Sequence, residues 1–286
     1  MLRFPVLDSP VMSEHEYGHV PDAGDPVRPL AIRRELKPVT RFFLPGEIGT
    51  PPPDLLRELQ ASAETVRRFV LERLLSANAG GEPALLVAIE AIGSAMSAAY
   101  EEQLSTQRQR DPELRRRFAS VDCRQGCAFC CHVNVTVSVL EAIRIAAALR
   151  TQRQDRESAI LSAAGALAGL SAADRLAMKA ACPLLVDGAC SIYDIRPIAC
   201  RALLSQSAAL CERQFDAGVE GADISVPMLV TPRLIAAGFI SGEIAAMEDL
   251  GLVAHLVELT AALALLLRDP TSLIRWLNGE DVFARA

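Results

Sequence analysis

The sequence has few aromatic residues and lacks several familiar functional motifs. Phe, Trp and Tyr make up 5% of its 286 residues while alanine is abundant, a balance that favours helix over sheet. We find no glycine-rich nucleotide-binding loop, no phosphate-binding P-loop and no convincing Ser-His-Asp order. The formal net charge of -6 gives no indication of binding to nucleic acid or to an anionic membrane surface.

Segments that direct a protein to a membrane are also missing. The start, Met-Leu-Arg-Phe-Pro, has no uninterrupted apolar stretch of the secretory kind. The apolar segment 252–267 contains His255 and Glu258 and is shorter than a membrane span, so we expect a buried core helix there. We therefore expect a cytoplasmic protein with no membrane association. In a reducing compartment, eight cysteines indicate metal or redox chemistry rather than a disulfide framework.

The pattern of apolar residues predicts a helical body. Apolar residues recur at helical spacing from Asp54 to the Gly80-Gly81 pair, and Pro83 is placed to open a second helix. Ser138 and Glu141 have the spacing of a capping box, which predicts another helix start. Further helices are expected over residues 156–168, from Ser171, from Pro197, from Ser207, from Thr231, over 243–267 and around Trp276.

Strand signals are few and local. Residues 133–139 are rich in β-branched side chains and could form a short strand. Asp187-Gly188 predicts a tight turn in a small hairpin that carries Cys182 and Cys190. The strand–helix alternation of a doubly wound or barrel fold is missing. We therefore predict a mainly α fold: a helical bundle with an inserted cysteine-rich metal-binding loop region and little or no β structure.

Proline divides the chain into two regions. Residues 1–53 contain ten of the seventeen prolines and predict an extended arm, whereas residues 54–286 predict a single helical domain with its cysteine segment at about 120–205. The arm includes His15-Glu16-Tyr17-Gly18-His19, which matches the zinc-protease pattern H-E-x-x-H. That pattern needs a helix, and the glycine and nearby prolines argue against one, so we treat the match as weak.

Four of the eight cysteines fall within nine residues, with the spacing C-x3-C-x2-C-C. Thiolates bind soft metals and iron, and such short spacings let neighbouring sulfurs converge on one centre. A single tetrahedral zinc needs four ligands, so the surplus of thiols indicates a multinuclear site, or one closed site plus reactive thiols. The first group is Cys123, Cys127, Cys130 and Cys131, and the second is Cys182, Cys190, Cys200 and Cys211.

The tandem pair Cys130 and Cys131 adds a geometric argument. In an extended segment, neighbouring side chains point to opposite sides, so we expect these two sulfurs on different metals or on different irons of a cluster. His132 follows directly and could be a ligand or a hydrogen-bond donor to a thiolate. Cys211, on a helix of its own, could equally be a small buried hydrophobe.

These motifs together resemble the YkgJ-type cysteine-cluster family, which is described as a zinc- or iron-chelating domain. The resemblance covers about residues 120–205 and rests on both cysteine groups together with the element Arg196-Pro197-x2-Cys200-Arg201. It implies metal binding and does not obviously extend to Cys211. The ligands that it implies are Cys123, Cys127, Cys130, Cys131, Cys182, Cys190 and Cys200.

Three functions remain open from the sequence. The first is a protein that holds an iron–sulfur cluster, with [4Fe–4S] preferred, or zinc, with Arg196 and Arg201 offsetting the thiolate charge. The second is an iron–sulfur enzyme that uses S-adenosylmethionine. A similar cluster occurs in flagellin lysine methylases, and Cys123-x3-Cys127-x-Phe129-Cys130 resembles the radical S-adenosylmethionine signature. The third is an interaction module in which a metal staples the fold and the helical body binds an unknown protein partner.

Overall fold

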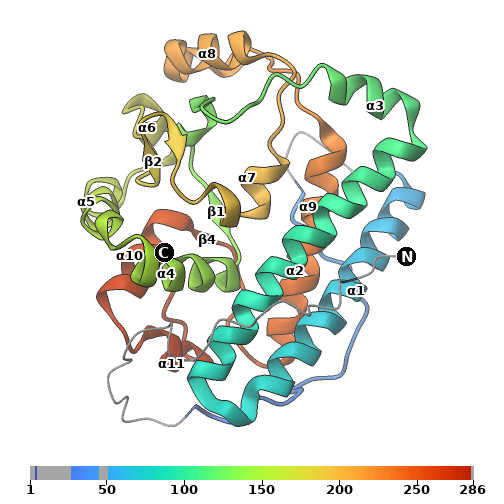
Figure 1. Cartoon of the computed structure of the whole chain (residues 1–286), viewed down its shortest axis with the longest axis vertical. Coiled ribbons are helices and arrows are strands. Elements are labelled where there is room, and N and C mark those ends of the chain that lie inside the picture. The colour runs from blue at the N-terminus through green and yellow to red at the C-terminus, as the bar shows by residue number, and fades with distance from the viewer. Residues whose placement is uncertain (1–3, 5–26, 45–50, 285–286) are drawn as a thin grey trace.

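The computed structural model describes residues 4, 27–44 and 51–284, and it is mainly helical (Figure 1). The H-E-x-x-H match at residues 15–19 lies outside the described residues. The predicted fold class is confirmed. The α-helices are α1 Pro53–Ala77, α2 Gly81–Arg110, α3 Pro112–Ala119, α4 Val139–Gln152, α5 Glu157–Leu167, α6 Ala172–Ala177, α7 Ile198–Ala202, α8 Ala208–Ala217, α9 Val230–Asp249, α10 Leu259–Arg268 and α11 Ser272–Leu277.

The long helices α1, α2 and α9 lie side by side and form one half of the molecule (Figure 1). Tyr100 of α2 meets Phe239 of α9 edge to face, with ring centroids 6.2 Å apart. A Cβ atom at Gly242 of α9 would lie 2.3 Å from the Ala63 carbonyl oxygen of α1. Only glycine therefore permits α1 and α9 to approach this closely.

The described residues contain two short antiparallel strand pairs. Strands β2 (Leu185–Val186) and β3 (Ala189–Cys190) form the predicted hairpin, with φ of 49° at Asp187 and 76° at Gly188. Positive φ at both turn residues matches the two-residue hairpin turn. Strand β1 (Thr136–Val137), within the predicted 133–139 segment, pairs with β4 (Val257–Glu258). Both pairs are small additions to a helical body.

The continuous helix predicted over residues 243–267 is wrong. Helix α9 runs from Val230 to Asp249, and α10 begins only at Leu259. Gly251 adopts a φ of 65°, its N–H donates to the Glu248 carbonyl, and the Leu252 N–H donates to the Met247 carbonyl. These two bonds form a Schellman motif, which ends a helix at a left-handed glycine.

Several other helix starts follow the predicted signals. Ser138 and Glu141 form the capping box at the start of α4, and both of its bonds are present. Pro197 precedes α7, and the Ser207 side chain accepts the Leu210 N–H at the start of α8. α2 begins at Gly81, two residues before the expected Pro83.

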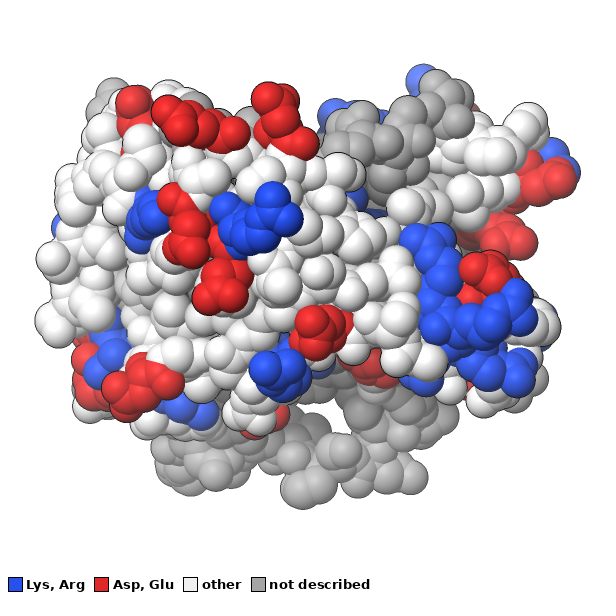
Figure 2. All heavy atoms as spheres, turned by 90° about the horizontal axis from the view of Figure 1, so that it is seen from above, with Lys and Arg blue, Asp and Glu red and all other residues white. Residues whose placement is uncertain are grey.

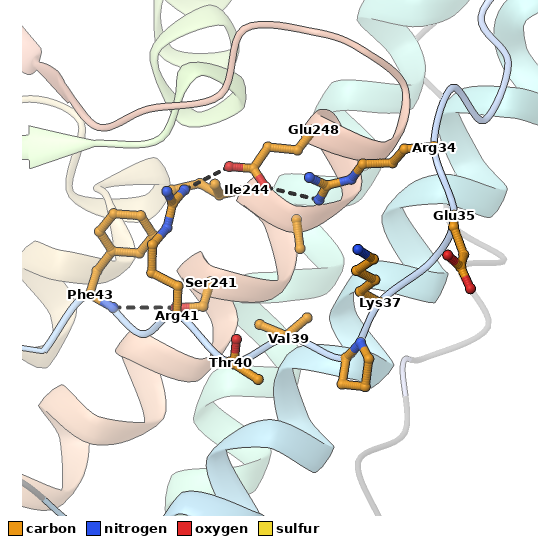
Figure 3. Close-up of a pocket in the computed structure, with 12 residues that line it drawn as sticks. Arg34, Glu35, Lys37, Val39, Thr40, Arg41, Phe43, Ser241, Ile244 and Glu248 are labelled. Carbon is orange, nitrogen blue, oxygen red and sulfur yellow. Dashed lines mark hydrogen bonds and ion pairs between the residues drawn. The ribbon is translucent and has the colours of Figure 1, made fainter.

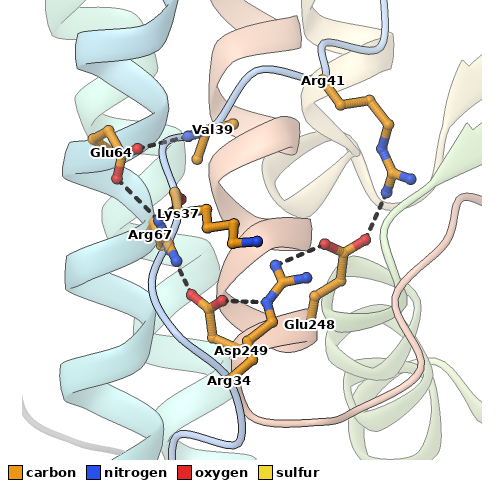
Figure 4. Close-up of polar contacts among 8 residues, drawn as sticks. All are labelled: Arg34, Lys37, Val39, Arg41, Glu64, Arg67, Glu248 and Asp249. Carbon is orange, nitrogen blue, oxygen red and sulfur yellow. Dashed lines mark hydrogen bonds and ion pairs between the residues drawn. The ribbon is translucent and has the colours of Figure 1, made fainter.

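Residues 27–44 form no regular element and lie along α1 and α9, held by polar contacts (Figure 4). Arg34 pairs with Asp249 at 2.7 Å, and the same carboxylate accepts from Arg67 of α1. Arg67 also donates to the Lys37 carbonyl at 2.6 Å, while the Val39 N–H donates to a Glu64 oxygen. Residues 27–44, the described part of the arm, are therefore fixed to the helices at several points.

Among the described residues, one helical stretch, 53–110, contains a window with mean hydropathy 1.4 that is long and apolar enough to cross a bilayer. This stretch consists of α1 and α2, which pack against each other and contribute to one hydrophobic core. Core helices pass the same hydropathy test, so the stretch is weak evidence for a span. The expected cytoplasmic location without a membrane stays a prediction.

Candidate metal centre

Seven of the eight cysteines line a single cavity of about 380 Å³, which we call the cysteine cavity. They come from three segments that are distant in sequence: the loop at 123–131, the hairpin region at 182–190 and α7. These seven are the predicted ligands. The structure thus brings the two cysteine groups together, whereas the ligand role of each residue stays a prediction.

The loop that carries the first four cysteines is tightly turned. Gly126 has a φ of 91°, a conformation that glycine adopts without strain. Phe129–His132 forms a short 3₁₀ helix, in which the Cys131 N–H donates to the Ala128 carbonyl at 2.9 Å. The premise that Cys130 and Cys131 lie in an extended segment is wrong, because this segment is helical. Their side chains interact directly with each other. That the two sulfurs bind different metals or different irons stays a prediction.

Backbone hydrogen bonds join this loop to the other cysteine segments. The Cys182 N–H donates to the Cys131 carbonyl at 2.7 Å, which ties the start of the hairpin region to the loop. The Asp122 N–H donates to the Ser205 carbonyl, and the Ser205 N–H donates to Cys123 Sγ at 3.1 Å. The relative positions of the sulfurs are therefore set by the backbone rather than by packing alone.

The backbone N–H two residues further along the chain opposes the rise in pKa of three thiols. The pairs are Phe129 with Cys127, Leu184 with Cys182 and Ile192 with Cys190. Such N–H···S bonds stabilise a thiolate and, in iron–sulfur proteins, help to set the reduction potential. The cavity therefore provides for charged sulfur in its backbone as well as in its cysteines.

Several of these thiols nevertheless have a raised pKa. Burial raises the pKa of Cys182 to about 11, and burial also raises the pKa of Cys123, Cys127, Cys190 and Cys200. A metal that binds here must displace these protons.

Cys130 is the member of the group that interacts with all the others. Its contact with Cys131 is the first cause of its raised pKa, and burial is the second. Its charge also contributes to the raised pKa of cysteines in all three segments: Cys123, Cys127, Cys182, Cys190 and Cys200. Cys130 has the most accessible side chain of the eight, yet it lines the cavity. Cys130 therefore lies among cysteines from all three segments.

The two predicted arginines have different positions. Arg196 lines the cysteine cavity, and its guanidinium lies 4.0 Å from the centre of the Tyr193 ring. Its Nε is buried and has no hydrogen-bond partner among the residues that the structure describes. Its positive charge opposes the rise in the pKa of Cys130 and Cys190. Arg201 donates to the Arg196 and Asp194 carbonyls and does not line the cavity. Arg201 therefore braces the loop, while Arg196 faces the sulfurs.

The sequence left the roles of His132 and Cys211 open, and the structure shows where each of them lies. His132 Nδ1 lies 3.1 Å from the Ala128 carbonyl, and its ring packs 4.5 Å from that of Phe215, so it is not among the residues that line the cysteine cavity. Cys211 lies close enough to Cys123 and Cys127 for its charge to raise their pKa, behind the larger effect of burial. Sequence reasoning left Cys211 outside the group because only the docking of α8 brings it there.

No group of three or more His, Cys, Asp or Glu side chains within residues 4, 27–44 and 51–284 is already arranged to hold a metal ion. The seven cysteines instead share the lining of the cysteine cavity with other residues. The donor set still fits a thiolate-bound metal, because it combines seven thiols, N–H···S bonds and a buried arginine nitrogen that needs an acceptor.

Residues 122–216 match the family model "CxxCxxCC: Putative zinc- or iron-chelating domain". The match confirms the resemblance to a cysteine-cluster family and supports metal binding through the cysteines. It also extends beyond the expected residue 205 and includes Cys211. No curated protein and no solved structure matches the chain.

Proposed function

We propose that the cysteine cavity holds an iron–sulfur cluster. The observation that carries this proposal is the convergence of seven thiols from three segments on one cavity. The ligands come from Cys123, Cys127, Cys130, Cys131, Cys182, Cys190 and Cys200, with Cys211 as a further donor beside the first two.

Two features support iron–sulfur over a single zinc ion. The thiols exceed the four ligands of tetrahedral zinc, and they surround a cavity of about 380 Å³. The cluster would supply a one-electron redox centre, with [4Fe–4S] the preferred form. Arg196 would contribute its buried Nε–H and its positive charge to an anionic, sulfur-rich occupant.

The proposal is tested by purifying the full chain without oxygen and measuring iron, zinc and acid-labile sulfide. We expect a brown protein with broad visible absorption and comparable amounts of iron and sulfide. A colourless protein with stoichiometric zinc would contradict the iron–sulfur proposal and would support the metal-stapled interaction module instead.

Cys130→Ser is the most informative single change, because Cys130 interacts with cysteines from all three segments. We expect it to lower bound iron at least about tenfold, since changes at metal sites cost on the order of 10–100-fold in affinity. Val133→Ser, which changes an exposed cavity-lining side chain in the same region, serves as the matched control and should retain the metal. Equal iron in the Cys130→Ser and wild-type proteins would sink the ligand assignment.

Cys211→Ser then measures how far the ligand set extends. From its place beside Cys123 and Cys127, we expect partial loss of iron, smaller than in Cys130→Ser. The sequence alone suggested that this change would cost little. Full retention of iron would show that Cys211 is not a ligand and serves in packing.

A catalytic role is the second candidate, and one observation favours it. The cavity has a wall without sulfur, made by Phe43 of the arm and by a face of α9 that includes Ala236 and Ile240. A purely structural metal site is closed on all sides, whereas a catalytic one keeps an open position. S-adenosylmethionine is the cofactor that the sequence suggested. If the reduced protein neither binds nor turns over S-adenosylmethionine, the catalytic role is contradicted.

A further inference from the structure

A dense group of arginines lies at the junction of α2 and α3, in a chain whose net charge is -6. Residues 108–117 contain five arginines and only two carboxylates, Asp111 and Glu113. Figure 2 shows Lys and Arg side chains gathered toward one side of the face above α3 and α8. We call this surface the arginine patch: Arg108, Arg110, Arg115, Arg116 and Arg117.

The positive charge of the patch is largely unpaired. Arg116 pairs with Glu113, and Asp111 is occupied in accepting the N–H groups at the start of α3. Over the part of the chain that the structure describes, the other four arginines form no ion pair with a carboxylate. Four patch arginines are exposed, and Arg117 is half-buried.

Three of these four arginines have described partners, and those partners are neutral. Arg108 lies over the Phe118 ring at 4.6 Å, and Arg115 donates to the Arg108 and Gln109 carbonyls at the end of α2. Arg117 approaches the Gln206 amide oxygen. Arginines at helix C-termini are favourable in any protein. Helix-end stabilisation explains why some of these arginines occur at the ends of α2 and α3, but it does not neutralise their charge at the surface.

A short path of contacts links the patch to the cysteine cavity. Arg117 meets Gln206 at 3.4 Å, and the Gln206 amide donates to Ser120 Oγ at 2.6 Å. The neighbouring Ser205 donates its N–H to Cys123 Sγ. Gln206, which contacts Arg117 of the patch, is thus the sequence neighbour of Ser205, whose N–H donates to Cys123 Sγ.

We propose that the arginine patch docks an acidic electron-carrier protein, which exchanges single electrons with the centre in the cysteine cavity. The inference rests on the iron–sulfur form of the proposed function. One electron leaves the reduced carrier and enters the centre, so the carrier is oxidised, the centre is reduced and no bond is made or broken.

The charge distribution favours a compact acidic protein over a polymer or a bilayer. A weak electron-transfer complex buries a small area and depends on complementary charge for fast association. A long nucleic acid or an anionic membrane would also contact surface outside residues 108–117. Because the chain has a net charge of -6, that surface would repel it. The patch also lies beside the cavity, where an electron donor must bind.

The test follows reduction of the iron-loaded full chain by a reduced, acidic plant-type [2Fe–2S] ferredoxin in a stopped-flow instrument. We expect the rate to fall about tenfold or more as ionic strength rises from low to high, because salt screens the attraction. Arg110→Glu should slow the reaction by about three- to tenfold at low salt, and Arg110→Gln by less. Arg110 makes no described contact, so neither change is expected to disturb the fold.

Arg68→Glu is the matched control, since it makes the same charge change at an exposed position on α1, and it should react at the wild-type rate. Dithionite, a small reductant that needs no docking, should reduce all variants equally. Equal ferredoxin rates for Arg110→Glu and wild type, or rates independent of salt, would overturn the inference. So would binding of a fluorescent single-stranded RNA, or of phosphatidylserine vesicles, that Arg110→Glu abolishes.

The two possible failures are distinguishable. Absence of iron and sulfide from the purified protein contradicts the iron–sulfur centre, and the inference falls with it. If the cluster is intact and the ferredoxin reduces the Arg110→Glu and wild-type proteins at equal rates, only the docking surface is contradicted.

Discussion

Two hollows of similar size are both lined in part by α9 and by Phe43, and they differ in how their polar groups are satisfied. One lies between the arm and α9 and measures about 430 Å³; its lining includes Arg34, Lys37, Arg41, Ser241 and Glu248, and we call it the arm groove (Figure 3). The other is the cysteine cavity, at about 380 Å³.

In the arm groove, most charges already have partners within the protein. Glu248 pairs with Arg34 at 2.9 Å and with Arg41 at 2.7 Å, and the Phe43 N–H donates to Ser241 Oγ (Figure 3). Seven thiols line the cysteine cavity, and the described residues offer no acceptor to the buried Arg196 Nε. Size alone therefore does not identify a site. The cysteine cavity differs from the arm groove in its group of thiols and in Arg196 Nε, a buried donor with no acceptor among the described residues.

The strongest expected effect on stability comes from breaking the charge network beside the arm groove. Asp249 is fully buried and serves both Arg67 and Arg34 (Figure 4). Asp249→Asn leaves the buried Arg67 guanidinium with Glu64 as its remaining carboxylate partner, at 3.3 Å. It should lower the free energy of unfolding by about 3 kcal/mol, measured by urea denaturation. Iron content per folded molecule should not change.

Asp155→Asn supplies the comparison for that variant, because Asp155 pairs with Arg156 at the surface. A change within about 0.5 kcal/mol is expected there. If Asp249→Asn proved equally mild, or if it released the metal, the division between a structural groove and a functional cavity would fail.

A smaller, pH-dependent effect is expected at Glu243, on α9. Burial raises the pKa of Glu243 to about 8, with Glu141 adding to the rise, while Ser138 Oγ donates to its carboxylate and opposes it. Arg144 lies near the pair in the same small pocket.

The sign of this effect follows from proton binding. Between its unfolded pKa near 4.5 and about 8, Glu243 binds its proton more strongly in the folded state. Stability from this group is complete below the lower value and is lost as pH rises through the upper one. Between pH 5 and pH 8, the free energy of unfolding of the wild-type protein should fall by on the order of 1–3 kcal/mol more than that of Glu243→Gln, measured by thermal or urea unfolding. An unchanged pH profile in the variant would mean that Glu243 is not the group responsible.

The smallest effect is expected from an exposed pair at the arm groove. Arg41 pairs with Glu248, and its side chain is 64% exposed, so solvent screens the interaction. Arg41→Gln should cost at most about 1 kcal/mol, and less at high salt. A larger, salt-independent loss would show that the contact of Arg41 with the Phe43 ring, 5.2 Å away, matters more than the ion pair.

The sequence predicted those features that depend on neighbouring residues. The capping box at Ser138, the Asp187-Gly188 turn and the helix after Pro197 each rest on bonds made within a few residues. The helix end at Gly251 had a signal of the same kind. It was missed because the apolar residues after it continue to look helical, although they enter a loop that leads to β4.

The site required more than local signals. Spacing identified the cysteines, yet the interaction of Cys130 with Cys131 depends on a 3₁₀ turn that spacing does not reveal. Cys211 reaches the group because the Ala208 N–H donates to Asp122 and because Phe215 packs on His132. These contacts join residues more than eighty positions apart, so no local pattern encodes them.

By itself, the sequence determined that this protein is helical, that cysteine dominates its chemistry, and where its caps and turns fall, because these depend on short-range geometry and residue type. Only the tertiary structure decided which sulfurs share a cavity, that Arg196 rather than Arg201 faces them, and that Gly242 lets α9 cross close to α1. The physical reason is that convergence depends on long-range packing, in which each element is positioned by partners far away in the chain.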